Sequence, residues 1–179
     1  MKGRESAYRI VPGQPALIPD LLRLQRTLND HLPSPAGPEG VLFGEALTWE
    51  DLQVIAEADE LTVCLFEERV VGYYLLDNYS RSRALIWHRR MVANCVDLGV
   101  LPALHAISLR AQCVVDARHQ RQGVSRRLLA GLLTQLKGRY DSLAGTISTF
   151  NPTLPAHQRL GWQIRATFGD AHLLLHELK

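Results

Sequence analysis

The sequence has few cysteines, no long apolar run and almost no excess of charge. Its three cysteines, Cys64, Cys95 and Cys113, are widely separated and odd in number, which fits neither a disulfide framework nor the paired spacing of a zinc site. No run approaches the ~20 apolar residues of a membrane-spanning helix, and the first residues lack the apolar core of a signal peptide. We therefore expect a cytoplasmic protein that holds no metal and enters no membrane.

The overall composition predicts one globular unit. The formal net charge is +2 over 179 residues, of which 46% are hydrophobic. A chain of this length can bury one sizeable core, so we expect a single domain over 1–179. Because positive and negative charges nearly balance, a local cluster of arginines indicates a small anionic ligand better than a nucleic acid.

Apolar spacing predicts a mixed α/β fold in which helices lie on a largely antiparallel sheet. Leucines spaced by four and three residues predict a helix from Leu17, and Thr48 with Asp51 predicts a capped start for a second helix. The proline-rich segment 33–40 between them predicts a loop at the edge of a substrate site. Further helices are predicted over 81–99, 124–137 and 154–160, and strands over 7–11, 61–66, 70–76, 106–116, 143–150, 162–168 and 171–178.

The strand over 106–116 leads through a basic loop into the clearest helical pattern of the chain. Strict alternation gives this strand one apolar face and one polar working face, the latter formed by Ser108, Arg110 and Gln112. The loop reads "RHQRQG" over 118–123, and an apolar stripe from Val124 to Leu136 follows it. The sequence therefore predicts a strand, a short loop and a helix in direct succession.

Such a loop suits an anion. Free backbone N–H groups and the positive end of the helix dipole favour negative charge at a helix start, and Gly123 lets a phosphate approach the main chain closely. Arg121 and Arg126 add positive charge. The loop lacks the Lys-Ser/Thr ending of a P-loop and the G-x-G-x-x-G of a dinucleotide fingerprint, so a phosphorylated ligand of another kind is expected.

Two segments resemble the GNAT superfamily of acyl-coenzyme A dependent N-acyltransferases. Gln120-Arg121-Gln122-Gly123-Val124-Ser125 is similar to the Gln/Arg-x-x-Gly-x-Gly/Ala motif that follows the fourth strand, with Ser125 in place of Gly or Ala. The later "NPTLPAHQRLGW" resembles the segment in which an Asn ends the fifth strand and a Gly-aromatic pair follows a short helix. Asn151 matches the Asn, and His157 stands where the family usually has a tyrosine.

The resemblance implies a fold, a cosubstrate and a set of site residues. The fold is a mostly antiparallel sheet of six to seven strands with a splay between the fourth and fifth, flanked by four to five helices. Acetyl-CoA would bind with its pyrophosphate on the loop and its pantetheine arm along the splay. The residues implied for this binding are Cys113, Val114, Val115, Gln120, Arg121, Gln122, Gly123, Val124, Ser125, Arg126 and Asn151.

The implied reaction is direct attack on the thioester by a primary amine of a small molecule or a peptide. His157 is expected to protonate the departing thiolate, because an imidazole titrates near neutrality. The polar strand face carries no carboxylate to act as base, and His105 is a weak candidate for that role. Because no base is evident, a non-catalytic acyl-CoA sensing module stays open as an alternative function. A nucleic-acid binder that uses 118–127 is an alternative of another class, and a homodimer stays open as the oligomeric state.

Overall fold

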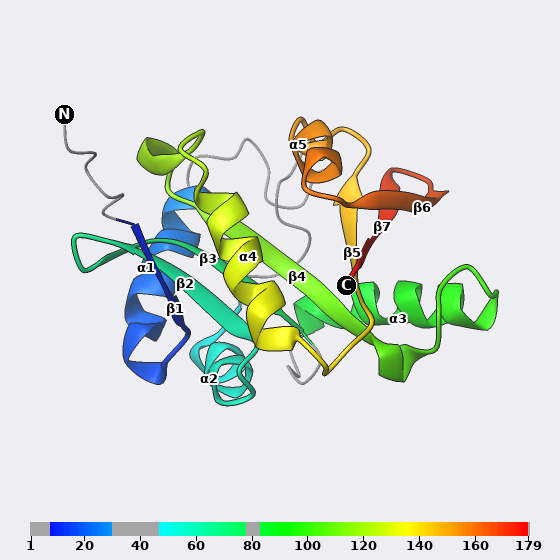
Figure 1. The fold of residues 1–179 in the computed structure, drawn as a ribbon, viewed down its shortest axis with the longest axis horizontal. Coiled ribbons are helices and arrows are strands. Elements are labelled where there is room, and N and C mark those ends of the chain that lie inside the picture. The colour runs from blue at the N-terminus through cyan, green and yellow to red at the C-terminus, as the bar shows by residue number, and fades with distance from the viewer. Residues whose placement is uncertain (1–7, 30–46, 78–82, 179) are drawn as a thin grey trace.

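The computed structural model describes residues 8–29, 47–77 and 83–178. Their seven strands form one sheet in the order β1-β2-β3-β4-β5-β7-β6, with five α-helices around it (Figure 1). The strands are β1 (Tyr8–Pro12), β2 (Leu61–Phe66), β3 (Arg69–Leu76), β4 (Ile107–Val115), β5 (Ser142–Ser148), β6 (Gln163–Phe168) and β7 (Ala171–Glu177). The helices are α1 (Ile18–Asn29), α2 (Trp49–Glu57), α3 (Arg83–Asp97), α4 (Val124–Leu136) and α5 (Leu154–Arg159).

The predicted mixed α/β architecture is confirmed. Every neighbouring pair of strands is antiparallel except β4 and β5, which run parallel. The capping box of Thr48 and Asp51 starts α2 as predicted. The predicted loop over 33–40 lies outside the described residues.

The helices cover the two faces of the sheet. On one face, the apolar stripe of α4 packs against alternate residues of β3 and β5, including Tyr74 and Leu143. On the other face, α1 and α2 pack against Val63 and Tyr73, and α3 packs against Ala144. Because neighbouring strand residues point to opposite faces, Tyr73 and Tyr74 separate into these two cores. Figure 1 shows α4 crossing the strands between β2 and β4.

The predicted splay between β4 and β5 is present. The two strands pair only from Ile107 opposite Ser142 to Arg110 opposite Gly145, although both strands continue beyond this point. From Ala111 onward β4 therefore has no strand on its β5 side. This opening is directed toward the end of β4 at which the basic loop begins.

The single polar face predicted for β4 is wrong. Arg110 and Gln112 lie opposite the consecutive residues Leu76 and Leu75 of β3, so Ala111 is an extra residue in the ladder. This irregularity turns the side chains on either side of it to opposite faces of the sheet. Gln112 accepts a hydrogen bond from Tyr73 on the α1 side, whereas Arg110 lies over Trp162 on the α4 side. Both side chains are buried, so neither lies on a solvated face.

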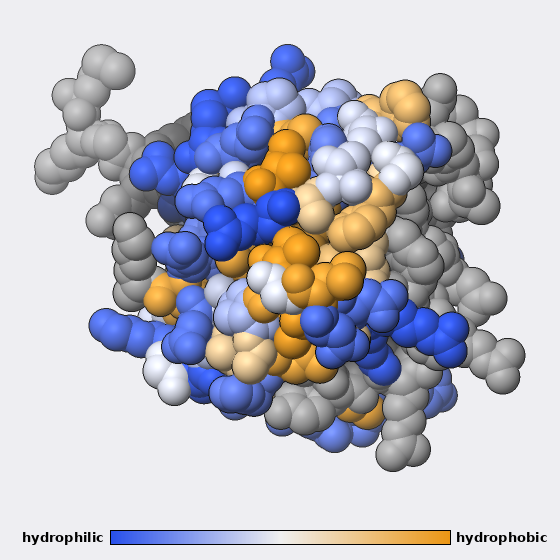
Figure 2. Space-filling model, turned by 90° about the vertical axis from the view of Figure 1, so that its right-hand side faces the viewer, coloured by the Kyte–Doolittle hydropathy of each residue, from blue (hydrophilic) through white to orange (hydrophobic). Residues whose placement is uncertain are grey.

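The strand β6 forms one edge of the sheet. Its apolar side chains Ile164 and Phe168 are exposed. Figure 2 shows the side of the molecule that β6 and α3 reach in Figure 1, and apolar residues gather there between hydrophilic ones. Within the described ranges, no helix is long and apolar enough to span a membrane, and no three metal-binding side chains form a cluster.

Candidate functional site

The loop after β4 presents its main chain to solvent. Gly123, immediately before α4, has the left-handed φ of +78°, and a Cβ on this residue would meet open space. No side chain caps the helix start, so the first N–H groups of α4, from Val124 to Arg126, have the usual free donors of a helix N-terminus. Ser125 and Arg126 are exposed. The geometry is that of an open anion cradle.

The loop is held in place by the first strand. The hydroxyl of Tyr8 donates to Oε1 of Gln122 at 2.5 Å and lies 2.9 Å from Nδ1 of His119. Nε2 of Gln122 donates back to the carbonyl of Arg118 at 2.9 Å. Tyr8 thus ties the loop to the sheet, a role that the sequence pattern did not indicate, because the two segments are more than a hundred residues apart.

The unpaired half of β4 runs from the splay to this loop. Val114 is buried in the core on the α1 side, so only its backbone faces the opening. Cys113 lies on the α4 side, where burial raises the pKa of its thiol to about 11 against smaller opposing effects of Arg110 and of a hydrogen bond with Ser125. The Ser125 hydroxyl, the one departure from the motif, therefore lies close to this thiol.

Asn151 and His157 belong to one hydrogen-bonded turn after β5. Oδ1 of Asn151 accepts from the N–H of Thr153 at 2.9 Å and from its hydroxyl at 2.7 Å, which fixes the start of α5. One helical turn later, Nδ1 of His157 lies 2.9 Å from the carbonyl oxygen of Thr153. Since a carbonyl only accepts, Nδ1 carries the hydrogen and Nε2 presents a lone pair.

The surroundings of His157 favour its neutral form. Burial and the nearby cation of Arg110 lower the pKa of this imidazole to about 4, against a smaller opposing effect of the Thr153 carbonyl. At neutral pH the Nε2 atom is therefore a proton acceptor rather than a donor.

Arg110 itself lies at the closed end of the splay. It is 7% exposed, its Nη2 donates to the carbonyl of Thr146 on β5 at 3.1 Å, and its guanidinium carbon lies 5.0 Å from the Trp162 ring centroid. A Cβ on Gly145 would lie 3.0 Å from its Nε atom, so glycine makes room for this side chain. The sequence pattern placed Arg110 on a polar working face of the strand and indicated no ligand for it.

The predicted site residues lie on elements that adjoin the splay: the loop over 120–126, the part of β4 that is not paired with β5, and the turn after β5 with Asn151 and His157. This succession of elements is the path along the splay. The binding and catalytic roles of these residues stay predictions. His105, the weak candidate for a base, is exposed and precedes β4 at the end away from the loop.

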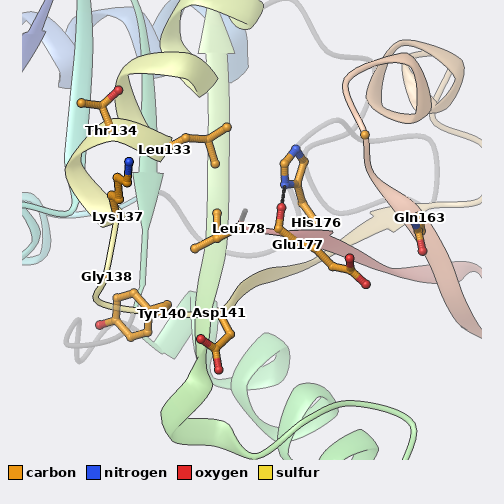
Figure 3. Close-up of a pocket in the computed structure, with 11 residues that line it drawn as sticks. Leu133, Thr134, Lys137, Gly138, Tyr140, Asp141, Gln163, His176, Glu177 and Leu178 are labelled. Carbon is orange, nitrogen blue, oxygen red and sulfur yellow. Dashed lines mark hydrogen bonds between the residues drawn. The ribbon is translucent and has the colours of Figure 1, made fainter.

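A separate pocket lies at the other end of α4. It has a volume of about 920 Å³, and Figure 3 shows its lining by the C-terminal half of α4 and the end of β7, with Nδ1 of His176 3.0 Å from the carbonyl of Glu177. None of the predicted site residues lines it.

Comparisons of sequence alone identify nothing: the chain matches no protein-family model and no curated protein. Solved structures do match. N-acetylglutamate synthase from Neisseria gonorrhoeae, in complex with coenzyme A and N-acetyl-glutamate, is 15% identical with a TM-score of 0.65, and the match covers 99% of this chain but only 36% of that one. PaiA N-acetyltransferase from Thermoplasma acidophilum, in complex with coenzyme A, is 7% identical with a TM-score of 0.65, over 95% of this chain and 98% of that one.

A third match comes from another reaction class. The GNAT-like decarboxylase GphF, in complex with isobutyryl-CoA, is 16% identical with a TM-score of 0.63, over 96% of this chain and all of that one (100%). These likenesses define the class of fold, that of the GNAT proteins. The chain described here has the GNAT fold, as the resemblance implied.

Proposed function

We propose that this protein is an acyl-coenzyme A dependent N-acyltransferase, with acetyl-CoA as the simplest donor and a primary amine of a small molecule or peptide as acceptor. One observation carries the proposal: the splay between β4 and β5 opens toward the exposed Gly123 loop. Solved proteins of the same fold bind coenzyme A or isobutyryl-CoA, and a long thioester with a pyrophosphate matches both parts of this path.

The backbone supplies most of the proposed binding. The N–H groups from Gly123 to Arg126 hold the pyrophosphate, which needs close approach rather than particular side chains. The unpaired edge of β4 from Cys113 to Val115 hydrogen-bonds the amides of the pantetheine arm, as a further strand would. Asn151, whose Oδ1 already accepts from Thr153, offers its amide N–H groups to the same arm.

The neutral state of His157 suggests a proton relay in place of a simple acid. The amine attacks the thioester carbon, and Nε2 of His157 accepts the proton that the new N–C bond makes acidic. The C–S bond then breaks, and the imidazolium returns this proton to the departing thiolate, so that an amide and free coenzyme A result. An imidazolium whose pKa lies near 4 gives up its proton readily.

The test combines binding with turnover. Acetyl-CoA and coenzyme A should raise the melting temperature, since a ligand at 100 times its Kd stabilises by ~2.7 kcal/mol, whereas adenine nucleotides without the pantetheine arm should act more weakly. Release of free thiol with a broad panel of amines then measures the reaction. His157→Phe should lose most of the turnover and keep its affinity for coenzyme A.

Other results would assign other functions. Tight binding of acetyl-CoA without thiol release above buffer for any amine would indicate a sensing module. No thermal shift with either coenzyme would overturn the proposal. Binding of DNA or RNA that falls steeply with salt would then favour a nucleic-acid surface over 118–127.

A further inference from the structure

The guanidinium of Arg110 bridges the two strands where they separate. Arg110 forms the last residue pair between β4 and β5, opposite Gly145. Its Nη2 atom donates to the carbonyl of Thr146, the first residue of β5 beyond that pair. The charged group therefore lies within the splay, at the point that a ligand entering from the Gly123 loop reaches last.

This cation has fewer partners than a buried arginine needs. Of its nitrogen atoms, Nε and Nη1 are buried and have no hydrogen-bond acceptor. Trp162 offers the face of its ring, which attracts a cation but leaves the N–H groups unbonded. A buried charge is costly unless it is paired and hydrogen-bonded, and unsatisfied buried donors in a native protein call for a specific explanation.

The side chains around Arg110 bring no negative charge. The hydroxyl of Tyr74 is buried beside Arg110 without a well-formed hydrogen bond, and burial raises its pKa more than the nearby guanidinium lowers it. Burial raises the pKa of the Cys113 thiol to about 11 and lowers that of His157 to about 4, so all three groups are neutral at neutral pH. Across residues 8–29, 47–77 and 83–178, no carboxylate makes a salt bridge with Arg110.

We propose that Arg110 binds a carboxylate group of the ligand at the closed end of the splay. A carboxylate is the planar anion that an arginine recognises best, and the phosphates of the same ligand are already accounted for at the loop. The proposal rests on the proposed function, because it assumes that an acyl-CoA occupies the splay. It narrows the substrate class to one that carries a carboxylate near the thioester.

The side of the sheet to which Arg110 points favours the acyl chain, rather than the acceptor, as the source of this carboxylate. Arg110 points to the α4 side, as do Cys113 and Ser125 next to the loop. Gln112 and Tyr73 point to the opposite side, toward α1 and α2. The GNAT resemblance implies that the acceptor amine enters from the side of these first two helices. The favoured donor is therefore the coenzyme A thioester of a dicarboxylic acid, such as malonyl-CoA. The other source of a carboxylate would be an amino acid that serves as the acceptor.

Equilibrium binding separates the acyl chain from the rest of the coenzyme. Malonyl-CoA and isovaleryl-CoA have acyl groups of the same shape, with a charged carboxylate in the first and a neutral branched end in the second. The wild-type protein should bind malonyl-CoA at least ~10-fold more tightly, the range expected for hydrogen bonds to a charged group. Arg110→Met should abolish this preference and leave the affinity for coenzyme A itself unchanged.

Two further variants make the test decisive. Arg165→Met removes an exposed arginine on the edge strand β6 and should keep the full preference for malonyl-CoA. If Arg110→Met does not fold, Arg110→Lys keeps the charge without the planar fork and should show a reduced preference. The melting temperature of unliganded Arg110→Met should stay level or rise, because replacing a poorly paired buried ion by an apolar side chain is often stabilising.

The second arm tests the acceptor. With saturating acetyl-CoA, an α-amino acid and its primary amide are compared as acceptors. A preference for the amino acid that Arg110→Met removes would assign the carboxylate to the acceptor. Equal binding of malonyl-CoA and isovaleryl-CoA, no carboxylate preference among acceptors, and a lower melting temperature in Arg110→Met would overturn the proposal and leave Arg110 as a structural bridge. Failure of coenzyme A to bind would instead overturn the proposed function.

Discussion

The most direct prediction concerns the pH dependence of stability that His157 confers. Its pKa of about 4 in the folded protein lies below the ordinary value of about 6.5 that the unfolded chain should show. The unfolded state therefore binds more protons between these values, and the folded state loses stability as the pH falls through this range. The imidazole contributes no such loss well above pH 6.5, and the loss is complete below about pH 4.

The size of the effect follows from the two values. At 1.36 kcal/mol per pKa unit, the full difference corresponds to about 3 kcal/mol, of which about 2 kcal/mol is lost between pH 7 and pH 5. Urea unfolding at these two pH values, compared between wild type and His157→Phe, isolates this contribution because all other titrating groups are shared. The variant should lose about 2 kcal/mol less than the wild type on going to pH 5.

A control and a spectroscopic measurement complete the experiment. His105→Gln is the control, because it removes an exposed imidazole outside the splay. It shows how the loss of an exposed histidine changes the free energy of unfolding at the two pH values. An NMR titration of the His157 ring should show a midpoint near pH 4. An equal loss of stability in wild type and His157→Phe, or a midpoint near pH 6.5, would refute the reasoning and return His157 to the role of a simple acid.

Four further substitutions test the loop and the fold. Gly123→Ala and Gly138→Ala should introduce the same backbone strain, of about 1–2 kcal/mol, because both glycines have φ near +78° and open space at the Cβ position. Only Gly123→Ala should also weaken coenzyme A binding, and calorimetry measures this difference. Tyr8→Phe should lower coenzyme A affinity several-fold, because the loop loses its bond to Gln122, and thermal shift with coenzyme A checks this. Thr48→Ala should cost about 1 kcal/mol of unfolding free energy, measured with urea, with no effect on coenzyme binding.

Local sequence signals predicted the elements and the loop well. The capping box of Thr48 and Asp51 and the apolar stripe of α4 depend on residues three and four positions apart, so a single segment contains all the information. Gly123 was assigned to a loop at the start of a helix, and its left-handed backbone agrees. The splay came from the resemblance, not from periodicity.

The interior of the candidate site could not be predicted in this way. The alternation over 106–116 appeared regular, yet the extra residue Ala111 arises from pairing with β3, which no pattern within β4 reveals. The tie between Tyr8 and Gln122 joins distant segments. The pKa of His157 depends on Arg110 and on burial, which exist only after the sheet has formed.

The irregularity at Ala111 links these features. At this residue the pairing with β3 shifts, and directly before it the pairing with β5 ends. A regular strand would keep Arg110 and Gln112 on one face, and the opening between β4 and β5 would then receive polar groups from that side only. Because the extra residue turns them apart, a cation lies on the α4 side of the sheet and an amide on its α1 side. A carboxylate bound to Arg110 would also offset the charge that helps keep His157 neutral, so binding of the acyl group and the basicity of the imidazole are coupled through one side chain.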